Sequence, residues 1–132
     1  MNAHKIRLLI PGAAGELIDK LSILEIKKDR ISGVEKQKNI QHELTSLQHV
    51  RAELGQDTRL DELHQALRQV NESLWVVEDK LRLKEKARDF GEEFIELARS
   101  VYRLNDKRAA LKREVNLYVG SDIVEEKSYQ AY

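Results

Sequence analysis

Two apolar heptad patterns in the second half of the chain constrain its fold more than any other feature. In each pattern the residues recur at alternating steps of three and four, which places them along one side of an α-helix. A β-strand would spread the same residues over both of its faces, because its side chains alternate with a period of two. The first pattern comprises Leu60, Leu63, Leu67, Val70, Leu74, Val77 and Leu81. The second comprises Phe94, Leu97, Val101, Leu104, Arg108, Leu111, Val115 and Tyr118.

These patterns predict two long helices, at about residues 58–89 and 92–119, joined at Phe90-Gly91. At 1.5 Å per residue they form an antiparallel hairpin about 45 Å long. Two shorter helices are predicted before it, over about residues 15–31 and 35–54, with a break at Ser32-Gly33. We therefore predict an all-α fold, a helical bundle built on the long hairpin, in a single domain of residues 1–132.

The two ends of the chain are predicted to lie outside the helices, as a short extended segment over residues 1–14 and a tail over residues 121–132. Residues 5–10 have strand character and are stopped by Pro11-Gly12, and Ile123-Val124 is the other segment with that character. Because an isolated strand leaves its backbone groups unpaired, the two segments are expected to pair as a short β-ribbon, or each across a dimer. We expect no order beyond Tyr129.

Composition limits the classes of partner. Lysine and arginine total 23, and so do aspartate and glutamate, so the electrostatic footprint of a nucleic-acid-binding protein is missing. The basic row Arg99, Arg103 and Lys107 is interleaved with Glu96 and Asp106, which favours a solvated salt-bridge face. No apolar run is long enough to span a bilayer, and we expect a cytoplasmic protein without a membrane partner.

No chemical motif predicts a cofactor, a metal or a catalytic residue. The chain has no cysteine, and His42 and His49 are too far apart along a helix to share a metal. The stretch from Pro11 to Gly15 precedes a helix, where backbone amides can bind an anion, but it lacks the lysine of a phosphate-binding loop and favours a plain turn.

Polar residues within the heptad patterns mark the candidate site. Arg108 occupies a position that should be apolar, and an unpaired buried guanidinium would be costly, so it needs a carboxylate or solvent. The antiparallel register of the hairpin makes Glu72 its predicted partner. Arg108 is then either a residue at the edge of the bundle or part of an internal network that binds an anion or sets the register.

A second stripe, beside the heptad patterns, combines amide and aromatic side chains. The same register brings Trp75 near Asn105 and Glu78 near Tyr102. This seam is either an ordinary margin of the core or the wall of a ligand pocket. The candidate binding residues are therefore Asn71, Glu72, Trp75, Glu78, Tyr102, Asn105 and Arg108.

The first helix also has apolar residues on two sides, because Ile23 and Ile26 lie opposite Leu17. Such a helix is sandwiched between layers or contributes to an interface. The two short helices either lie end to end along the hairpin or fold back on each other. In the second case they cover half of the hairpin and leave apolar surface for a second subunit, and with Ile23 and Ile26 this favours a homodimer.

Four stretches resemble an uncharacterised bacterial family, a small helical domain of unknown function. They are GELIDKLSILEIKKDRI (15–31), VNESLWVVEDKLR (70–82), FIELARSVYRLNDKRAALKREVN (94–116) and IVEEKSY (123–129). The resemblance implies no activity or cofactor, and only suggests that residues 102–106 and the EEKSY tail share a site. Ile18-Asp19, Leu21, Leu24 and Arg30 are also similar to the first helix of the all-helical chorismate mutases.

Two functions remain open. The first is a non-enzymatic helical interaction or scaffold protein that forms a homodimer or binds another protein. The second is a small helical-bundle enzyme or binding protein for a small anionic metabolite, as the likeness to chorismate mutases implies. A concave, water-accessible surface around Asn105 and Arg108 would favour the second, and closed packing there would favour the first.

Overall fold

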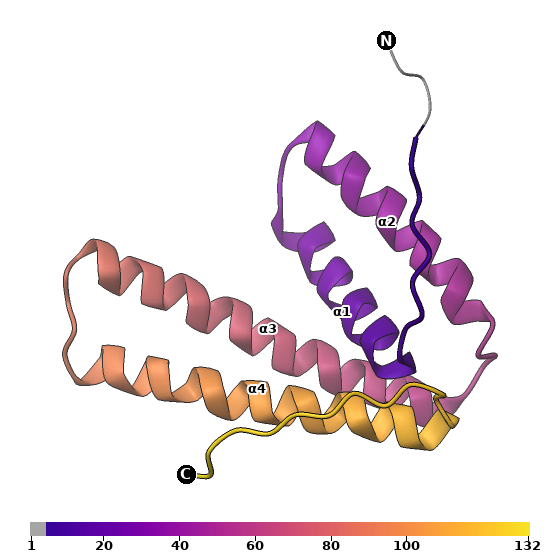
Figure 1. The fold of residues 1–132 in the computed structure, drawn as a ribbon. Coiled ribbons are helices and arrows are strands. Elements are labelled where there is room, and N and C mark those ends of the chain that lie inside the picture. Colours follow the sequence, from indigo (N-terminus) through magenta and orange to yellow (C-terminus); the bar gives the residue numbers. More distant parts are fainter. Residues whose placement is uncertain (1–4) are drawn as a thin grey trace.

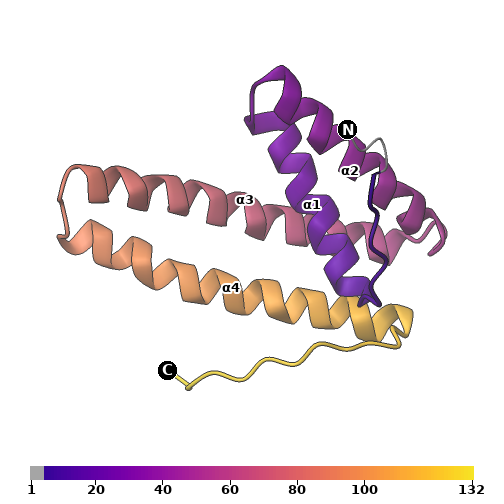
Figure 2. The ribbon, with the colours of Figure 1, turned by 45° about the horizontal axis from the view of Figure 1, so that its top comes forward.

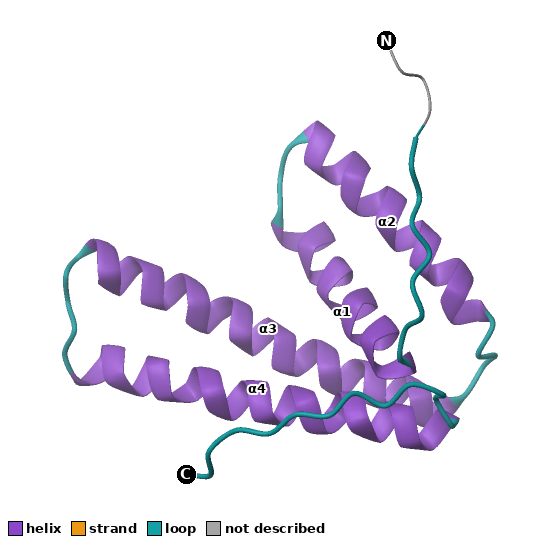
Figure 3. Cartoon of the chain, viewed as in Figure 1, coloured by secondary structure: helices purple, strands orange, loops and turns teal. Residues whose placement is uncertain are grey.

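The structure is a computed structural model that describes residues 5–132, and these residues form four helices and no strand (Figure 3). The elements are α1 (Ala14–Arg30), α2 (Val34–Ala52), α3 (Thr58–Lys86) and α4 (Glu92–Val119). All their ends lie within three residues of the predicted bounds. The all-α prediction is confirmed.

Local chemistry sets where the long helices begin and end. Asp57 caps α3, because its side chain accepts a hydrogen bond from the backbone N–H of Leu60 at 3.0 Å. Gly120 ends α4 in the left-handed conformation, with φ at 73°. The α3 helix stops three residues earlier than predicted. Arg88 already has φ at 52° there and turns the chain toward α4.

The helices form two hairpins that cross (Figures 1 and 2). In one, α3 and α4 run antiparallel, as the heptad patterns predict. In the other, α1 and α2 fold back on each other, and α1 lies across one end of the α3–α4 hairpin. Helix α2 packs on the other side of α1, so α1 is the middle layer.

The core lies where the hairpins cross. Apolar side chains from all four helices meet there: Ile18, Leu21, Leu24, Ile40, Leu44, Leu60, Leu63, Leu67 and Val115. The sandwiched position explains why α1 is apolar on two sides. Ile26 is only 1% exposed and is not available to a second subunit, whereas Ile23 is partly exposed and its place in a dimer interface stays a prediction. The hairpin already covers Ile26.

The first turn of α1 is capped by Asn116 of α4 and by Ser121, which lies two residues beyond the end of that helix. The backbone N–H of Gly15 donates to Asn116 Oδ1 at 2.6 Å, and that of Ala14 donates to Ser121 Oγ at 3.1 Å. Two of the amides that an isolated helix would leave open therefore already have acceptors. The alternative that Pro11 to Gly15 binds an external anion loses the support of those two amides.

The predicted β-ribbon between the termini is not seen in residues 5–132. Residues 5–10 run beside α2, where Arg7 Nη2 donates to Ser46 Oγ at 2.9 Å, whereas Ile123 and Val124 run beside α4 (Figure 1). The two segments lie on different helices and cannot pair within one chain. Residues 1–4 of the predicted N-terminal segment lie outside the described residues.

The far half of the α3–α4 hairpin extends beyond the core (Figure 1). We call residues 74–104 the distal hairpin and residues 87–91 its tip. No residue from Glu72 to Glu114 is buried. Within the distal hairpin the heptad residues are only half-buried: Leu74, Val77, Leu81, Phe94, Leu97, Val101 and Leu104.

Candidate functional site

Arg108 pairs with Asp19, not with the predicted Glu72. Its Nε donates to Asp19 Oδ1 at 2.9 Å and its Nη2 to Asp19 Oδ2 at 2.6 Å. The Asp19 side chain is fully buried, whereas that of Arg108 is 31% exposed. This two-point pairing matches the planar fork of a guanidinium to both oxygens of one carboxylate. The hydrogen bond to Asp19 raises the pKa of Arg108, which remains a fixed cation.

Asn71 and Ser22 complete the hydrogen bonds around this ion pair. Asn71 Nδ2 donates to Asp19 Oδ1 at 2.9 Å and to Ser22 Oγ at 2.8 Å. Ser22 Oγ in turn donates to the backbone carbonyl of Asp19 at 2.7 Å. Within the described residues no buried side-chain nitrogen or oxygen lacks a partner. The network joins α1, α3 and α4, so it fixes how the hairpins cross.

Glu72 faces away from this network. It accepts from Arg30 Nε at 3.0 Å, and its side chain is 41% exposed. The hairpin register alone placed it opposite Arg108, but the guanidinium points toward α1, which crosses between them. Glu72 therefore does not belong with the other candidate site residues.

Four predicted site residues line one cleft, on the side of α1 that faces the distal hairpin. We call it the crossing cleft. Its volume is about 430 Å³, and Asn71, Trp75, Glu78 and Arg108 line it together with Ile23, Ile26, Leu74, Asp79 and Arg82. The predicted contact of Glu78 with Tyr102 is replaced by an ion pair between Glu78 and Arg82. The sole tryptophan, Trp75, is half-buried in this wall.

Asn105 and Tyr102 line a second cleft, on the α4 side, which also includes Arg108. We call it the tail cleft, because Lys127 and Tyr129 of the C-terminal tail close one side of it. Its volume is about 580 Å³. Arg108 is thus the one predicted residue common to both clefts, whereas Trp75 and Asn105 line different ones.

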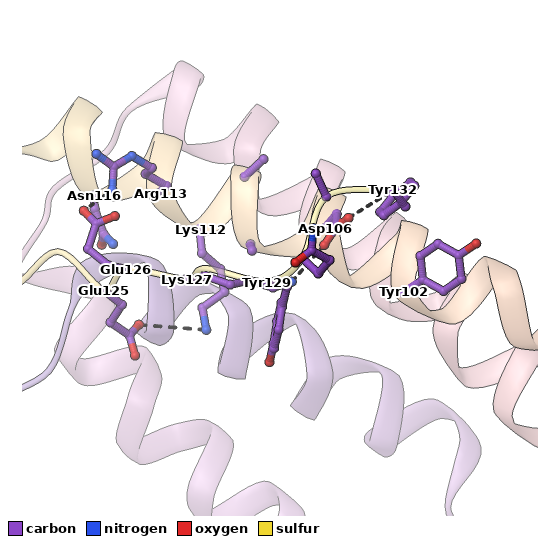
Figure 4. Close-up of a pocket in the computed structure, with 14 residues that line it drawn as sticks. Tyr102, Asp106, Lys112, Arg113, Asn116, Glu125, Glu126, Lys127, Tyr129 and Tyr132 are labelled. Atoms are coloured by element: carbon purple, nitrogen blue, oxygen red, sulfur yellow. Dashed lines mark hydrogen bonds and ion pairs between the residues drawn. The ribbon is translucent and has the colours of Figure 1, made fainter.

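The C-terminal tail runs back along α4 and is attached by alternating charges (Figure 4). Lys112 Nζ binds Glu16 at 2.7 Å and lies 3.9 Å from a Glu125 oxygen, and Arg113 pairs with Glu126. Between these contacts, α4 and the tail together line a pocket of about 890 Å³.

The end of the tail is attached to Asp106. The hydroxyl of Tyr132 and Lys127 Nζ donate to the two Asp106 oxygens at 2.8 and 3.0 Å, and the Tyr132 ring packs edge-on against Tyr102 with centroids 4.8 Å apart. The bond from Tyr132, and then that from Lys127, lowers the pKa of Asp106. The expectation of no order beyond Tyr129 is therefore wrong.

Sequence reasoning missed Asp19, although a signal was present. Asp19, Ser22 and Ile26 are spaced by three and four residues, so they lie on one face of α1. Two polar residues therefore share that face with an apolar one. A polar pair on a buried face calls for polar partners, and Arg108 is the partner on α4. Lys112 was missed because a salt bridge between distant segments leaves no local pattern. The proximity of the tail to residues 102–106, seen in the contact of Lys127 with Asp106, was suggested only by the family resemblance.

Within residues 5–132 no group of three or more metal-ligating side chains comes together, and no helix is long and apolar enough to cross a membrane. In the basic row, Arg99 pairs with Glu96 at 2.8 Å, as expected of a salt-bridge face.

The fold was compared with known proteins and families. Searches of curated proteins and of solved structures gave no match. The model of one protein family, described as a family of unknown function (DUF6165), matches residues 8–132. The match covers nearly the whole chain, and the chain belongs to this family of unknown function.

Proposed function

We propose that this protein is a helical interaction protein that self-associates through its distal hairpin. The observation that carries the proposal is the position of the core, which ends where α1 stops covering α3 and α4. The heptad residues beyond that point, from Leu74 to Leu104, are apolar but only half-buried. Two helices that contact each other along one seam leave both sides of that seam open to water.

The tip and its neighbouring turns add apolar surface that contacts no core residue. Leu83 is 66% exposed, Ile95 is 51% exposed and Phe90 is 49% exposed. Single exposed apolar residues are common, but here three occur within thirteen residues around the tip, where the half-buried seam ends. Covering them is favourable by about 25 cal/mol per Å² of apolar surface removed from water.

A second copy of the chain suits this surface because the distal hairpin has no net charge. The distal hairpin contains seven acidic and seven basic residues, so two copies of it do not repel each other. Two hairpins packed side by side make a four-helix bundle, in which each pair of helices covers the open seam of the other. A two-fold symmetric pairing achieves this with one self-complementary surface.

The test compares two equivalent leucine substitutions. Leu83→Glu places a charge on the distal hairpin, and Leu117→Glu places one on the covered end of α4, where Leu117 is 62% exposed. Light scattering after size exclusion should give twice the chain mass for the unmodified protein and for Leu117→Glu. Leu83→Glu should give the mass of one chain. A single-chain mass for the unmodified protein at high micromolar concentration would refute self-association.

The second candidate, binding of a small anionic metabolite, is favoured by one observation. The surroundings of Asn105 and Arg108 form a concave cleft of about 580 Å³, with Lys112 and Lys127 also in its wall. Clefts of this size hold small ligands. Calorimetric titration with chorismate, as a dicarboxylate probe, should detect binding that Lys112→Gln weakens and Leu117→Gln leaves unchanged.

A further inference from the structure

The crossing cleft and the tip of the hairpin are two uncovered features of the same chain. We propose that the tip of a second copy, with Phe90 foremost, docks in the crossing cleft beside Trp75, and that the reciprocal contact forms in the other copy. This arrangement rests on the proposed self-association and specifies its geometry. The two distal hairpins then lie antiparallel, with the α1–α2 hairpins at opposite ends.

The length of the distal hairpin fits this geometry. From Trp75 to Lys86, α3 extends about 17 Å at 1.5 Å per residue. When two hairpins overlap antiparallel over that length, the tip of each reaches the level of Trp75 in the other. At that level α1 begins to cover the hairpin, and the crossing cleft opens there. The two distal hairpins therefore overlap up to the level at which α1 of the other copy begins to cover its own hairpin.

The cleft and the tip are complementary in polarity. Ile23, Leu74 and Trp75 give the cleft an apolar wall, and its volume of about 430 Å³ exceeds that of one phenyl ring. Phe90 lies in the loop between α3 and α4, at the tip of the hairpin. It is half-exposed and its only aromatic neighbour among the described residues is Phe94, at 5.2 Å between ring centroids. An aromatic pair with Trp75 of the second copy would add to the burial.

The charges at the two features are also complementary. Asp79 lies at the cleft and Arg88 at the tip, and neither forms an ion pair within residues 5–132. Lys86, next to the tip, is likewise unpaired there, whereas Lys84 is held by Asp89 and Glu93. Docking brings Arg88 of each copy toward Asp79 of the other. Two such pairs form at once because the arrangement is two-fold symmetric.

The backbone at Arg88 supports a role for its side chain. Arg88 is the one non-glycine residue of the described chain with a positive φ, at 52°. The left-handed conformation is strained for a residue with a Cβ, whereas glycine adopts it freely. Arg88 is exposed at the tip, so the strained position carries a cation that solvent or a partner can reach.

A cross-linking experiment tests the geometry, and the chain has no cysteine of its own to interfere. The double variant Asp79→Cys/Arg88→Cys should form a covalent dimer under mild oxidation. A bond within one chain is excluded, because seven residues of α3 separate Asp79 from Lys86 by about 10 Å and a disulfide needs Cα atoms within about 7 Å. Arg88→Cys alone should not cross-link, because the tips lie at opposite ends.

The sole tryptophan gives a second, independent measurement. Diluting the unmodified protein through its dissociation range should shift Trp75 emission to longer wavelength as the docked tip leaves. Phe90→Ala should raise the dissociation constant at least tenfold and show the shift at higher concentration, whereas Leu117→Ala should behave as the unmodified protein does.

The outcomes separate this inference from the proposed function. A dimer in which Arg88→Cys cross-links to itself, or in which the double variant stays uncross-linked and Trp75 emission is unaffected by dilution, overturns the docking of the tip and leaves self-association standing. A protein that remains one chain at all concentrations overturns both.

Discussion

Gly15 of α1 lies directly against the backbone of Lys112 on α4. A Cβ atom added to Gly15 would be 2.2 Å from the Lys112 carbonyl oxygen and 2.8 Å from its carbonyl carbon. Both contacts are with backbone, so no side chain can rotate away to make room. The close crossing of α1 over α4 therefore depends on a residue without a side chain.

Gly15→Ala should lower the free energy of unfolding by about 2 kcal/mol or more. Overpacking costs roughly 1–3 kcal/mol, and moving α1 away also weakens the hydrogen bond from Gly15 to Asn116. Urea denaturation monitored by circular dichroism measures the change. Gly12→Ala is the matched control, since nothing lies within 4 Å of its Cβ position. Equal stability of the two variants would contradict the close approach.

The ion pair between Asp19 and Arg108 should be asymmetric when either residue is removed. Arg108→Met leaves a fully buried carboxylate without its cation, and such losses cost about 3–5 kcal/mol. Asp19→Asn leaves a guanidinium that still reaches water, and should cost less, about 1–3 kcal/mol. Chemical denaturation of both variants gives the two values. A larger loss of stability for Asp19→Asn than for Arg108→Met would contradict the finding that Asp19 is the more deeply buried partner.

Core and distal hairpin should respond differently to the same truncation. Leu67 is fully buried, and Leu67→Ala should cost about 2–5 kcal/mol. Leu97 is half-buried in the distal hairpin, so Leu97→Ala should cost markedly less when the protein is dilute enough to be one chain. Thermal unfolding at low concentration compares them. As concentration rises, the cost of Leu97→Ala should grow, because association buries this side chain.

Docking of the C-terminal tail should depend on pH through Asp106. The Tyr132 hydroxyl and then Lys127 lower the pKa of Asp106 when the tail is docked, so docking is stabilised above the ordinary carboxyl pKa. This stabilisation is lost as the pH falls below that range, through the lowered pKa of the docked state. NMR relaxation of residues 125–132 should show a mobile tail at pH 3 and an ordered one at pH 7.

Asp106→Asn is the control for this dependence. It should leave the end of the tail mobile at both pH values, while Glu126→Gln, at the other tail contact, should keep the pH dependence. A tail of Asp106→Asn that still becomes ordered between pH 3 and pH 7 would assign the dependence to another carboxylate.

The sequence predicted the helices and the long hairpin well, because heptad spacing and capping residues are local signals. The alternating three- and four-residue steps predicted where α3 begins and both bounds of α4. The end of α3 was misplaced because nothing in the composition of residues 86–89 indicates that Arg88 adopts a positive φ.

The contacts of the site could not be predicted in the same way. Glu72 was predicted as the partner of Arg108 from the antiparallel register of α3 and α4 alone. That register contains no information about α1, which carries the observed partner Asp19. The position of α1 decides the partner, and the angle at which one hairpin crosses another is set by side chains from three helices together. For the same reason Ile26 was assigned to an interface, although α1 is covered on both sides.

The capping of α1 by Asn116 and Ser121 has a consequence for synthesis of the chain. A nascent chain emerges from its N-terminus, so α1 and α2 leave the ribosome first. Yet the acceptors for the first amides of α1, and the cation for Asp19, lie 89 to 107 residues later in the chain. Helix α1 therefore reaches its final state only when α4 has been translated. A ribosome that stalls before residue 108 carries an N-terminal half whose Asp19 has no cation to pair with.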